Sequence, residues 1–217
     1  MIKAVIFDFD GLILDTESHE FAIYQEIFQE HGAELTLEVW GKEIGTASDF
    51  NPYLHLEECV GRTLNVADLK KEMQEKFGHR MDVELLRPGV EEYIKAAKSA
   101  GLRVGLASSS PASWVHGHLS RYGILELFEC IRTSDNVSQV KPDPELYLQV
   151  LDEFGISPEE ALVFEDSPNG ALAAERAGIR CVIVPNTVTT HLQFGKVTHR
   201  IHSMADITLA DLIHLVG

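Results

Sequence analysis

The chain has 217 residues, of which 45% are hydrophobic and 24% are charged, a balance typical of a globular protein with one core or with one core and a small second domain. Its 34 acidic and 18 basic residues give a formal net charge of −16. A surface this acidic repels the phosphates of nucleic acids and anionic lipids, so we expect neither a nucleic acid nor a membrane as a partner.

The first predicted element is a short buried strand from Ala4 to Phe7, which leads directly into Asp8-Phe9-Asp10-Gly11. From about Asp15 to Arg87 the apolar residues recur at helical spacing, and no run is typical of a strand. Two helical faces are visible there, one made by Phe21, Tyr24, Phe28 and His31 and the other by Val66, Leu69, Met73 and Phe77. The sequence therefore predicts an all-helical insertion after the first strand, ended by Pro88-Gly89.

After the insertion, short apolar runs alternate with segments at helical spacing. The predicted strands are Val104 to Ala107, Ala161 to Phe164, Cys181 to Val184 and, with a weaker pattern, Cys130-Ile131. The helices between them carry apolar faces such as Val115, Leu119 and Tyr122, or Leu146, Val150 and Phe154. This alternation is typical of βαβ units, so we predict an α/β protein with a doubly wound, Rossmann-like parallel sheet.

We expect two domains: an α/β core made of residues 1–14 and 86–217, and a small all-helical cap made of residues 15–85. Three helix starts are also predicted. Ser110-Pro111 and Asp143-Pro144 place a capping side chain before a proline, and Ser157 with Glu160 is the pattern of a capping box. The segment from Thr187 to Arg200 is polar and weakly patterned, and we predict a loop.

Acidic pairs stand at the ends of two predicted strands. Asp8 and Asp10 follow the first strand, and Glu165 and Asp166 follow the strand that begins at Ala161. Open α/β sheets build their sites at the carboxyl ends of strands, and carboxylate oxygens are ligands that Mg²⁺ prefers. The simpler alternatives are an acidic surface turn after the first strand and a helix N-cap at Asp166.

Two further features occupy equivalent places. Ser108 and Ser109 follow the strand that ends at Ala107 and precede a helix, where a hydroxyl and backbone N–H groups form an anion site; a plain serine N-cap is the alternative. Lys141 stands before another helix beside Pro142, which stiffens its backbone, and a solvated surface lysine is the alternative.

All these features fall at one predicted edge of a parallel sheet, and coincidence explains that less well than a shared site. Four carboxylates packed together would repel one another and raise some of their pKa values. A divalent cation and a lysine would offset that repulsion. Mg²⁺ and Lys141 would then supply the positive charge that an otherwise acidic protein needs to handle phosphate.

The motifs resemble those of the haloacid dehalogenase superfamily, and more narrowly its beta-phosphoglucomutase-like phosphatase branch. The pattern hhhhDxDGxxxDTE matches the chain up to Glu17, KPxPxxY matches Lys141 to Tyr147, and EDSxxGxxAAxxAG matches Glu165 to Gly178. The resemblance covers essentially the whole chain, the helical insertion included.

The resemblance implies roles for the matching residues. Asp8 would be the nucleophile that forms an aspartyl-phosphate, and Asp10 would protonate the leaving alcohol and then activate water. Mg²⁺ would be held by Asp8, by the backbone carbonyl of Asp10 and by Asp166, with Glu165 as a ligand or as the partner of a bound water. Ser108, the amide of Ser109 and Lys141 would hold the phosphoryl oxygens, and Glu17 would belong to the hinge into the cap.

Two departures from the mutase pattern bear on the reaction. Mutases carry a histidine in the hinge where this chain has Glu20, and an arginine in a cap loop where Gly45 to Ser48 stands here, with Ser48 at the arginine position. Without the arginine a doubly phosphorylated sugar lacks its second clamp, which favours a phosphatase over a mutase. Lys70, Lys71, Lys76 and Arg80 could bring positive charge toward the site, but a solvated helix face is the commoner arrangement, and they are assigned no role.

We therefore expect a phosphatase that acts on a small phosphorylated metabolite, with a phosphohexomutase as the alternative. A non-catalytic phospho-acceptor module is a third hypothesis, disfavoured because such modules lack the helical insertion and the DxDG motif.

The remaining expectations concern the setting of the protein. Cys59, Cys130 and Cys181 form no CxxC pair and are odd in number, so we predict three buried thiols in a reducing compartment. The first apolar run is short and is soon followed by a charged residue, unlike the apolar segment of a signal peptide. No apolar run approaches the roughly 20 residues that span a bilayer. We predict a cytoplasmic protein that is a monomer or a weak homo-oligomer.

Overall fold

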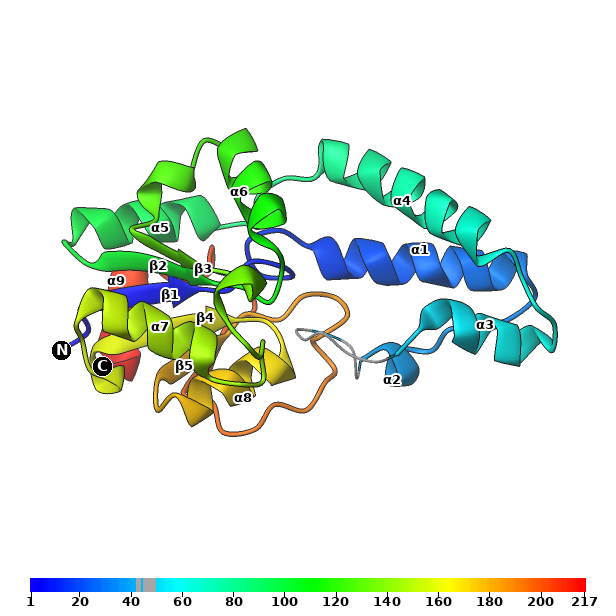
Figure 1. The fold of residues 1–217 in the computed structure, drawn as a ribbon. Coiled ribbons are helices and arrows are strands. Elements are labelled where there is room, and N and C mark those ends of the chain that lie inside the picture. The colour runs from blue at the N-terminus through cyan, green and yellow to red at the C-terminus, as the bar shows by residue number, and fades with distance from the viewer. Residues whose placement is uncertain (42–43, 45–49) are drawn as a thin grey trace.

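The computed structural model describes residues 1–41, 44 and 50–217. Within these residues six short strands form one parallel sheet in the order β3-β2-β1-β4-β5-β6 (Figure 1). The strands are β1 Ala4–Phe7, β2 Arg103–Ala107, β3 Cys130–Arg132, β4 Ala161–Glu165, β5 Arg180–Ile183 and β6 His199–Arg200. β1 lies inside the sheet, where Ala4 pairs with Arg103 of β2 on one side and with Ala161 of β4 on the other.

The helices in the described part of the chain fall into two groups. Four lie in the insertion that follows β1: α1 Thr16–Glu30, α2 Leu37–Trp40, α3 Pro52–Val60 and α4 Val66–Val83. Five accompany the sheet: α5 Val90–Ser99, α6 Ala112–Arg121, α7 Glu145–Phe154, α8 Pro168–Arg176 and α9 Leu209–Val216. Short 3₁₀ turns lie at Leu125–Leu127, Ser134–Asn136 and Pro158–Glu160.

Helices cover both faces of the sheet because successive strand residues point to opposite sides. Val5 and Phe7 of β1 belong to a buried cluster with α5, α6 and α9, whereas Ala4 and Ile6 belong to a cluster with α7 and α8. All four side chains are fully buried, so β1 reads as a continuous apolar run, as strands covered on both faces do. The predicted doubly wound α/β fold is confirmed.

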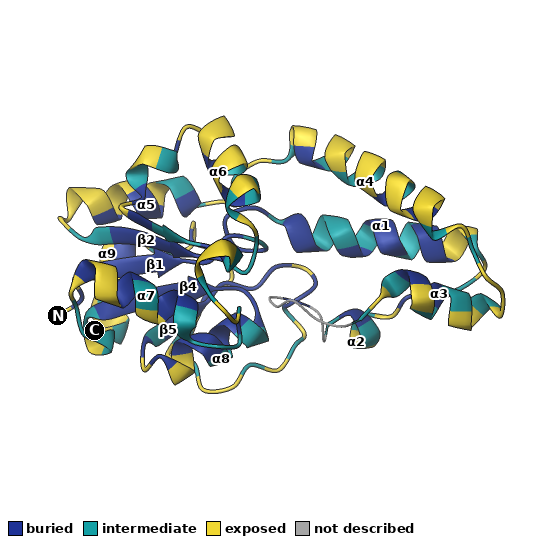
Figure 2. Cartoon of the chain, viewed as in Figure 1, coloured by how far each residue is buried: buried dark blue, intermediate teal, exposed yellow. Residues whose placement is uncertain are grey.

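The inserted helices form a separate layer with its own apolar cluster. α1 and α4 lie side by side and extend away from the sheet (Figure 1). The side of α4 that faces away from α1 is largely exposed, while the strands of the core are buried (Figure 2). The apolar cluster of the inserted helices contains Phe28, Leu56 and Met73 from three of these helices, together with Val188 from the loop after β5. The proposed boundaries of the cap, residues 15–85, stay a prediction.

Several local expectations were wrong. The segment from Thr187 to Arg200 ends in the two-residue strand β6, which is too short to carry an apolar pattern. Ser110 does not cap α6, since Pro111 holds the N-cap position and the carboxylate of Asp135 accepts from the N–H of Ala112 at 2.6 Å. Cys59 is exposed.

Other expectations were right. Ser157 and Glu160 form the predicted capping box, although the element they cap is a 3₁₀ turn. Cys130 and Cys181 are buried. In the described part of the chain, no helix is both long and apolar enough to cross a membrane.

Candidate active site

Three adjacent strands bring polar residues to one edge of the sheet. Ser108 follows β2, Asp8 follows β1 and Glu165 ends β4, and these strands are neighbours. The N–H of Asp8 donates to the carbonyl of Phe164 at 3.0 Å, so pairing between β1 and β4 continues up to the aspartate. The backbone of the sheet therefore fixes where these side chains begin.

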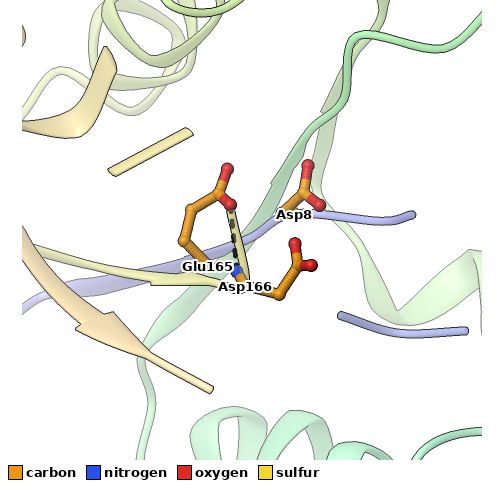
Figure 3. A group of neighbouring side chains, drawn as sticks. All are labelled: Asp8, Glu165 and Asp166. Carbon is orange, nitrogen blue, oxygen red and sulfur yellow. Dashed lines mark hydrogen bonds between the residues drawn. The ribbon is translucent and has the colours of Figure 1, made fainter. Parts of the chain in front are cut away.

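Asp8, Glu165 and Asp166 form a buried group of carboxylates. One oxygen from each side chain lies within 4.8 Å of the others, and Figure 3 shows the three side chains gathered at the ends of β1 and β4. Burial raises the pKa of Asp8 to about 8, the charge of Glu165 adds to the rise, and Lys141 opposes it. Burial and then the charge of Glu17 raise the pKa of Asp166 well above its usual range. The group is therefore unfavourable as it stands and is suited to a cation.

Asp166 supplies a direct test of whether a metal ion fits. Its Oδ2 atom accepts from the Asn186 side chain at 2.8 Å, but its Oδ1 atom is buried and has no hydrogen-bond partner within the described residues. Buried polar atoms are seldom left unpaired, and a carboxylate oxygen least of all. The residues present thus fit Mg²⁺, which prefers such oxygens.

Lys141 lies at the centre of the buried charges. Its ammonium group donates to Asp8 and, at 2.7 Å, to Oε1 of Glu165, and it is 1% exposed. Burial alone would lower the pKa of Lys141, but the charges of Asp8 and Glu165 outweigh it and hold the pKa above its ordinary value. Lys141 is therefore a fixed positive charge beside Asp8.

Glu165 is saturated by donors. Besides Lys141, its Oε1 accepts from the hydroxyl of Tyr147 at 2.8 Å, while its Oε2 accepts from the N–H of Asp166 at 3.0 Å and from the N–H and the hydroxyl of Ser167, each at 3.2 Å. A carboxylate offers about four lone-pair sites, and these donors use them. Glu165 is thus built to hold Lys141, and it has less acceptor capacity left for a metal than Asp166 has.

The carboxylate of Asp10 lies apart from that group. It accepts from the hydroxyl of Thr16 at 2.9 Å, from the hydroxyl of Ser110 at 2.6 Å and from the indole N–H of Trp114 at 2.9 Å. These donors come from the start of α1, from the loop after β2 and from α6. Asp10 lines the cavity described below, so its carboxylate is held in place and faces the space where a substrate would lie.

Ser108 and Ser109 both line the same cavity. The N–H of Ser108 donates to the carbonyl of Arg132 at 2.9 Å, which leaves the β2–β3 pairing intact, and its hydroxyl oxygen accepts from the N–H of Ser110 at 3.0 Å. The hydroxyl of Ser110 donates to Asp10, so the loop after β2 is tied to the residues that follow β1.

Sequence patterns did not point to several residues that hold the site together. Asn186, in the loop after β5, donates to Asp166 and to Glu17, the latter at 3.3 Å. Arg87 donates to the carbonyls of Gly11 at 2.6 Å and Val184 at 2.9 Å, and so ties the end of the insertion to the loop after β1. Neither Asn186 nor Arg87 forms a motif with its sequence neighbours, and only their spatial partners reveal them.

Gly11 is required by the close approach of two segments. It has a positive φ of +79°, and a Cβ atom at this position would collide with the carboxylate of Asp166 and approach the Asn186 amide to 2.8 Å. The glycine of the DxDG motif therefore lets the loop after β1 pass directly over the carboxylate group.

A cavity of about 710 Å³ opens above Asp8 and Asp10. Its wall combines core residues with residues of the inserted helices, among them Glu20, Tyr24 and Phe77. Its size is that of a small-molecule site. The loop from Gly45 to Ser48, where Ser48 occupies the position of the mutase arginine, lies outside the described residues.

Comparisons with known proteins agree over nearly the full length. A family model described as haloacid dehalogenase-like hydrolase matches residues 5–184. The chain is 56% identical over 213 residues to YhcW of Bacillus subtilis (strain 168), which is named as a predicted phosphatase, with 98% of this chain and 97% of that protein covered. It is 34% identical over 180 residues to a protein of Thermotoga maritima named phosphorylated carbohydrates phosphatase, with 82% of each covered.

A solved structure shows the same similarity in three dimensions. The crystal structure of CbbY from Rhodobacter sphaeroides in complex with phosphate has a TM-score of 0.75 at 30% sequence identity, with 98% of this chain and 100% of that chain covered. Coverage this complete includes both the sheet and the inserted helices.

Proposed function

The chain belongs to the haloacid dehalogenase-like hydrolases, and we propose that it is a Mg²⁺-dependent phosphatase that hydrolyses a small phosphomonoester, such as a sugar phosphate, through an aspartyl-phosphate on Asp8. The observation that carries the proposal is the buried group of Asp8, Glu165 and Asp166, with Lys141 bound to two of its members. Asp8 lines the cavity, and the buried ammonium group of Lys141 beside it would assist its action as a nucleophile.

The proposed metal ligands are the carboxylates of Asp8 and Asp166 and the backbone carbonyl of Asp10, with Glu165 beside them. The unpartnered Oδ1 of Asp166 supports this assignment. When bound, the ion would neutralise phosphoryl oxygens and the crowded carboxylates.

In the first step, an oxygen of Asp8 attacks phosphorus as the ester P–O bond breaks, and the leaving oxygen takes a proton from the carboxyl group of Asp10. Lys141, the hydroxyl of Ser108 and the N–H of Ser109 hold the phosphoryl oxygens, because this transfer depends mainly on positioning and electrostatic stabilisation.

In the second step, the Asp10 carboxylate removes a proton from water as the water oxygen attacks phosphorus. The bond to Asp8 breaks, which releases inorganic phosphate and restores both carboxyl groups. The donors around Asp10 suit this shuttle because they hold its carboxylate without neutralising it.

The test is hydrolysis of p-nitrophenyl phosphate with and without Mg²⁺, using Asp8→Asn and Asp10→Asn variants. We expect Asp8→Asn to be inactive and EDTA to abolish turnover, while Asp152→Asn on the exposed face of α7 serves as the matched control. Acid-quenched wild-type enzyme should carry covalent phosphate from labelled substrate. An active Asp8→Asn enzyme would overturn the proposal.

A phosphohexomutase is the second candidate, and product analysis with a hexose 1-phosphate separates the two reactions. Free phosphate supports the phosphatase, whereas a hexose 6-phosphate supports the mutase. The non-catalytic phospho-acceptor hypothesis is dropped, since the chain is a hydrolase of a family with phosphatase-named relatives. A cytoplasmic location and a monomer or weak homo-oligomer stay predictions.

A further inference from the structure

Five of the described residues that line the cavity are aromatic. Tyr24 and Trp40 lie 5.1 Å apart between ring centroids, and Trp40 and Phe50 lie 6.5 Å apart. Phe77 of α4 stacks on Trp114 of α6 at 5.8 Å, and all five residues line the cavity. Flat apolar rings of this kind pack against the C–H faces of a ligand.

Glu20 is the one charged residue that the described inserted helices contribute to this wall beyond the hinge residue Glu17. It is half-buried on α1, one helical turn after Glu17. Its carboxylate is therefore placed to accept hydrogen bonds from a ligand that sits between the rings and Asp10.

The positive charges on the described inserted helices are engaged away from the cavity. Lys76 pairs with Glu30 at 3.0 Å and with Glu72 at 2.7 Å, and Arg80 pairs with Glu26. Lys70 lies over the ring of Tyr53, 5.9 Å from its centroid. No lysine or arginine lines the cavity in the described part of the chain.

The surroundings of Glu20 also disfavour negative charge. Burial, and then the charge of Asp10, raise the pKa of Glu20 to about 7 from its ordinary 4.5. A second phosphate or a carboxylate on the substrate would meet the same poorly solvated surroundings, and it would be repelled by the charged form of Glu20.

We propose that the leaving group of the substrate is an uncharged polyhydroxy group, whose hydroxyls are bound by Glu20 between the aromatic rings, and that Glu20 excludes substrates with a second anionic group. The inference rests on the proposed phosphatase activity and narrows its substrate class. Glu20 is then a specificity-determining residue, because it acts on the part of the substrate that does not react.

The experiment compares kcat/KM for three substrates with Mg²⁺: a hexitol monophosphate, the corresponding hexitol bisphosphate, and an unbranched alkyl phosphate of the same chain length. The wild-type enzyme should prefer the hexitol monophosphate to each of the others by about tenfold or more, since an unpaired carboxylate and a like charge each cost that much. Glu20→Gln should raise the bisphosphate-to-monophosphate ratio by about tenfold. Glu26→Gln on the same helix does not line the cavity and should leave the ratio unchanged.

The outcomes separate the two proposals. Hydrolysis of p-nitrophenyl phosphate, together with a ratio that Glu20→Gln leaves unchanged, would overturn this inference and leave the phosphatase standing. Absence of turnover on every phosphomonoester would overturn the phosphatase itself. Should Glu20→Gln fail to fold, the wild-type ranking decides alone, because a preference for the bisphosphate or for the alkyl phosphate contradicts the inference.

Discussion

Asp10 illustrates how a single side chain in this site is held from several elements. Its three donors come from α1, from the loop after β2 and from α6, and one of them, Trp114, also stacks on Phe77 of the inserted helix α4. A shift of α4 relative to the core would therefore move Trp114 and change its hydrogen bond to Asp10, the proposed acid–base residue. The same contact gives Trp114 a positioning role.

Trp114→Phe should keep the stacking on Phe77 but remove the indole N–H from Asp10. A hydrogen bond to a charged group contributes about 1.5–3 kcal/mol, so we expect kcat to fall by about tenfold or more with a smaller change in KM. The pH dependence of kcat should also shift, which a purely structural defect would not produce. Ser113→Ala, on the exposed side of the same helix, is the control.

The stability of the metal-free protein should depend on pH through Asp8. The pKa of Asp8 is raised from 3.8 to about 8, so the folded protein holds a proton on Asp8 that the unfolded chain releases near pH 4. The free energy of unfolding therefore falls as the pH rises from about 4 to about 8. Urea unfolding should show a loss of about 1 kcal/mol per pH unit between pH 6 and pH 8.

Two controls isolate that effect. Asp8→Asn carries no titrating group at this position and should weaken the pH dependence, leaving the part that comes from Asp166 and Glu20, whose pKa values are also raised. Added Mg²⁺ should restore the stability of the wild type at pH 8. Equal stability of the metal-free wild type at pH 6 and pH 8 would contradict the raised pKa.

At the scale of elements, α8 is shaped around Glu165. A Cβ atom on Gly170 would overlap the Glu165 carboxylate, whereas a Cβ on Gly117 in α6 would meet no atom within 4 Å. The two glycines are thus a matched pair, since both lie inside helices and differ in what surrounds them.

Gly117→Ala should stabilise the protein by about 0.5–1 kcal/mol, the usual gain from alanine in a helix. Gly170→Ala should destabilise it despite the same gain, because Glu165 must move and release Lys141, and turnover of p-nitrophenyl phosphate should fall with it. Unfolding midpoints of both variants test this. A stabilised, fully active Gly170→Ala enzyme would show that Glu165 does not need its present position.

At the scale of the whole molecule, the net charge of −16 opposes the approach of an anionic substrate. Salt screens such long-range repulsion, and the Debye length falls from about 30 Å at 0.01 M to about 10 Å at 0.1 M. We therefore expect kcat/KM for a phosphomonoester to rise over this range of ionic strength at saturating Mg²⁺. A fall would indicate a positive field around the cavity entrance.

The core of the fold could be predicted from sequence because its strands are buried on both sides. Ala4–Phe7 and Ala161–Glu165 consist of consecutive buried residues that are almost wholly apolar. Such continuous apolar runs can be recognised from the sequence alone. β6 has two residues, one of them exposed, and carries no such signal.

Only part of the candidate site could be predicted from the sequence, and the reason differs from that for the fold. Asp8, Lys141 and Asp166 stand in short motifs next to strands or helix starts. Trp114 and Asn186 act on residues 104 and 20 positions away, and nothing in their sequence neighbours marks them as polar partners. Ser110 was predicted to cap a helix, because a serine before a proline has the same appearance whether it bonds its own backbone or a distant aspartate.

The position of β1 inside the sheet has a consequence for biosynthesis. β1, which leads into the proposed nucleophile Asp8, is translated before the other strands of the sheet, and its two neighbours, β2 and β4, follow about 100 and 160 residues later. Such pairings give a high contact order, which slows folding. A nascent chain released before β4 would lack one flank of β1 and the carboxylate partners of Asp8, so truncated translation products should have no hydrolytic activity.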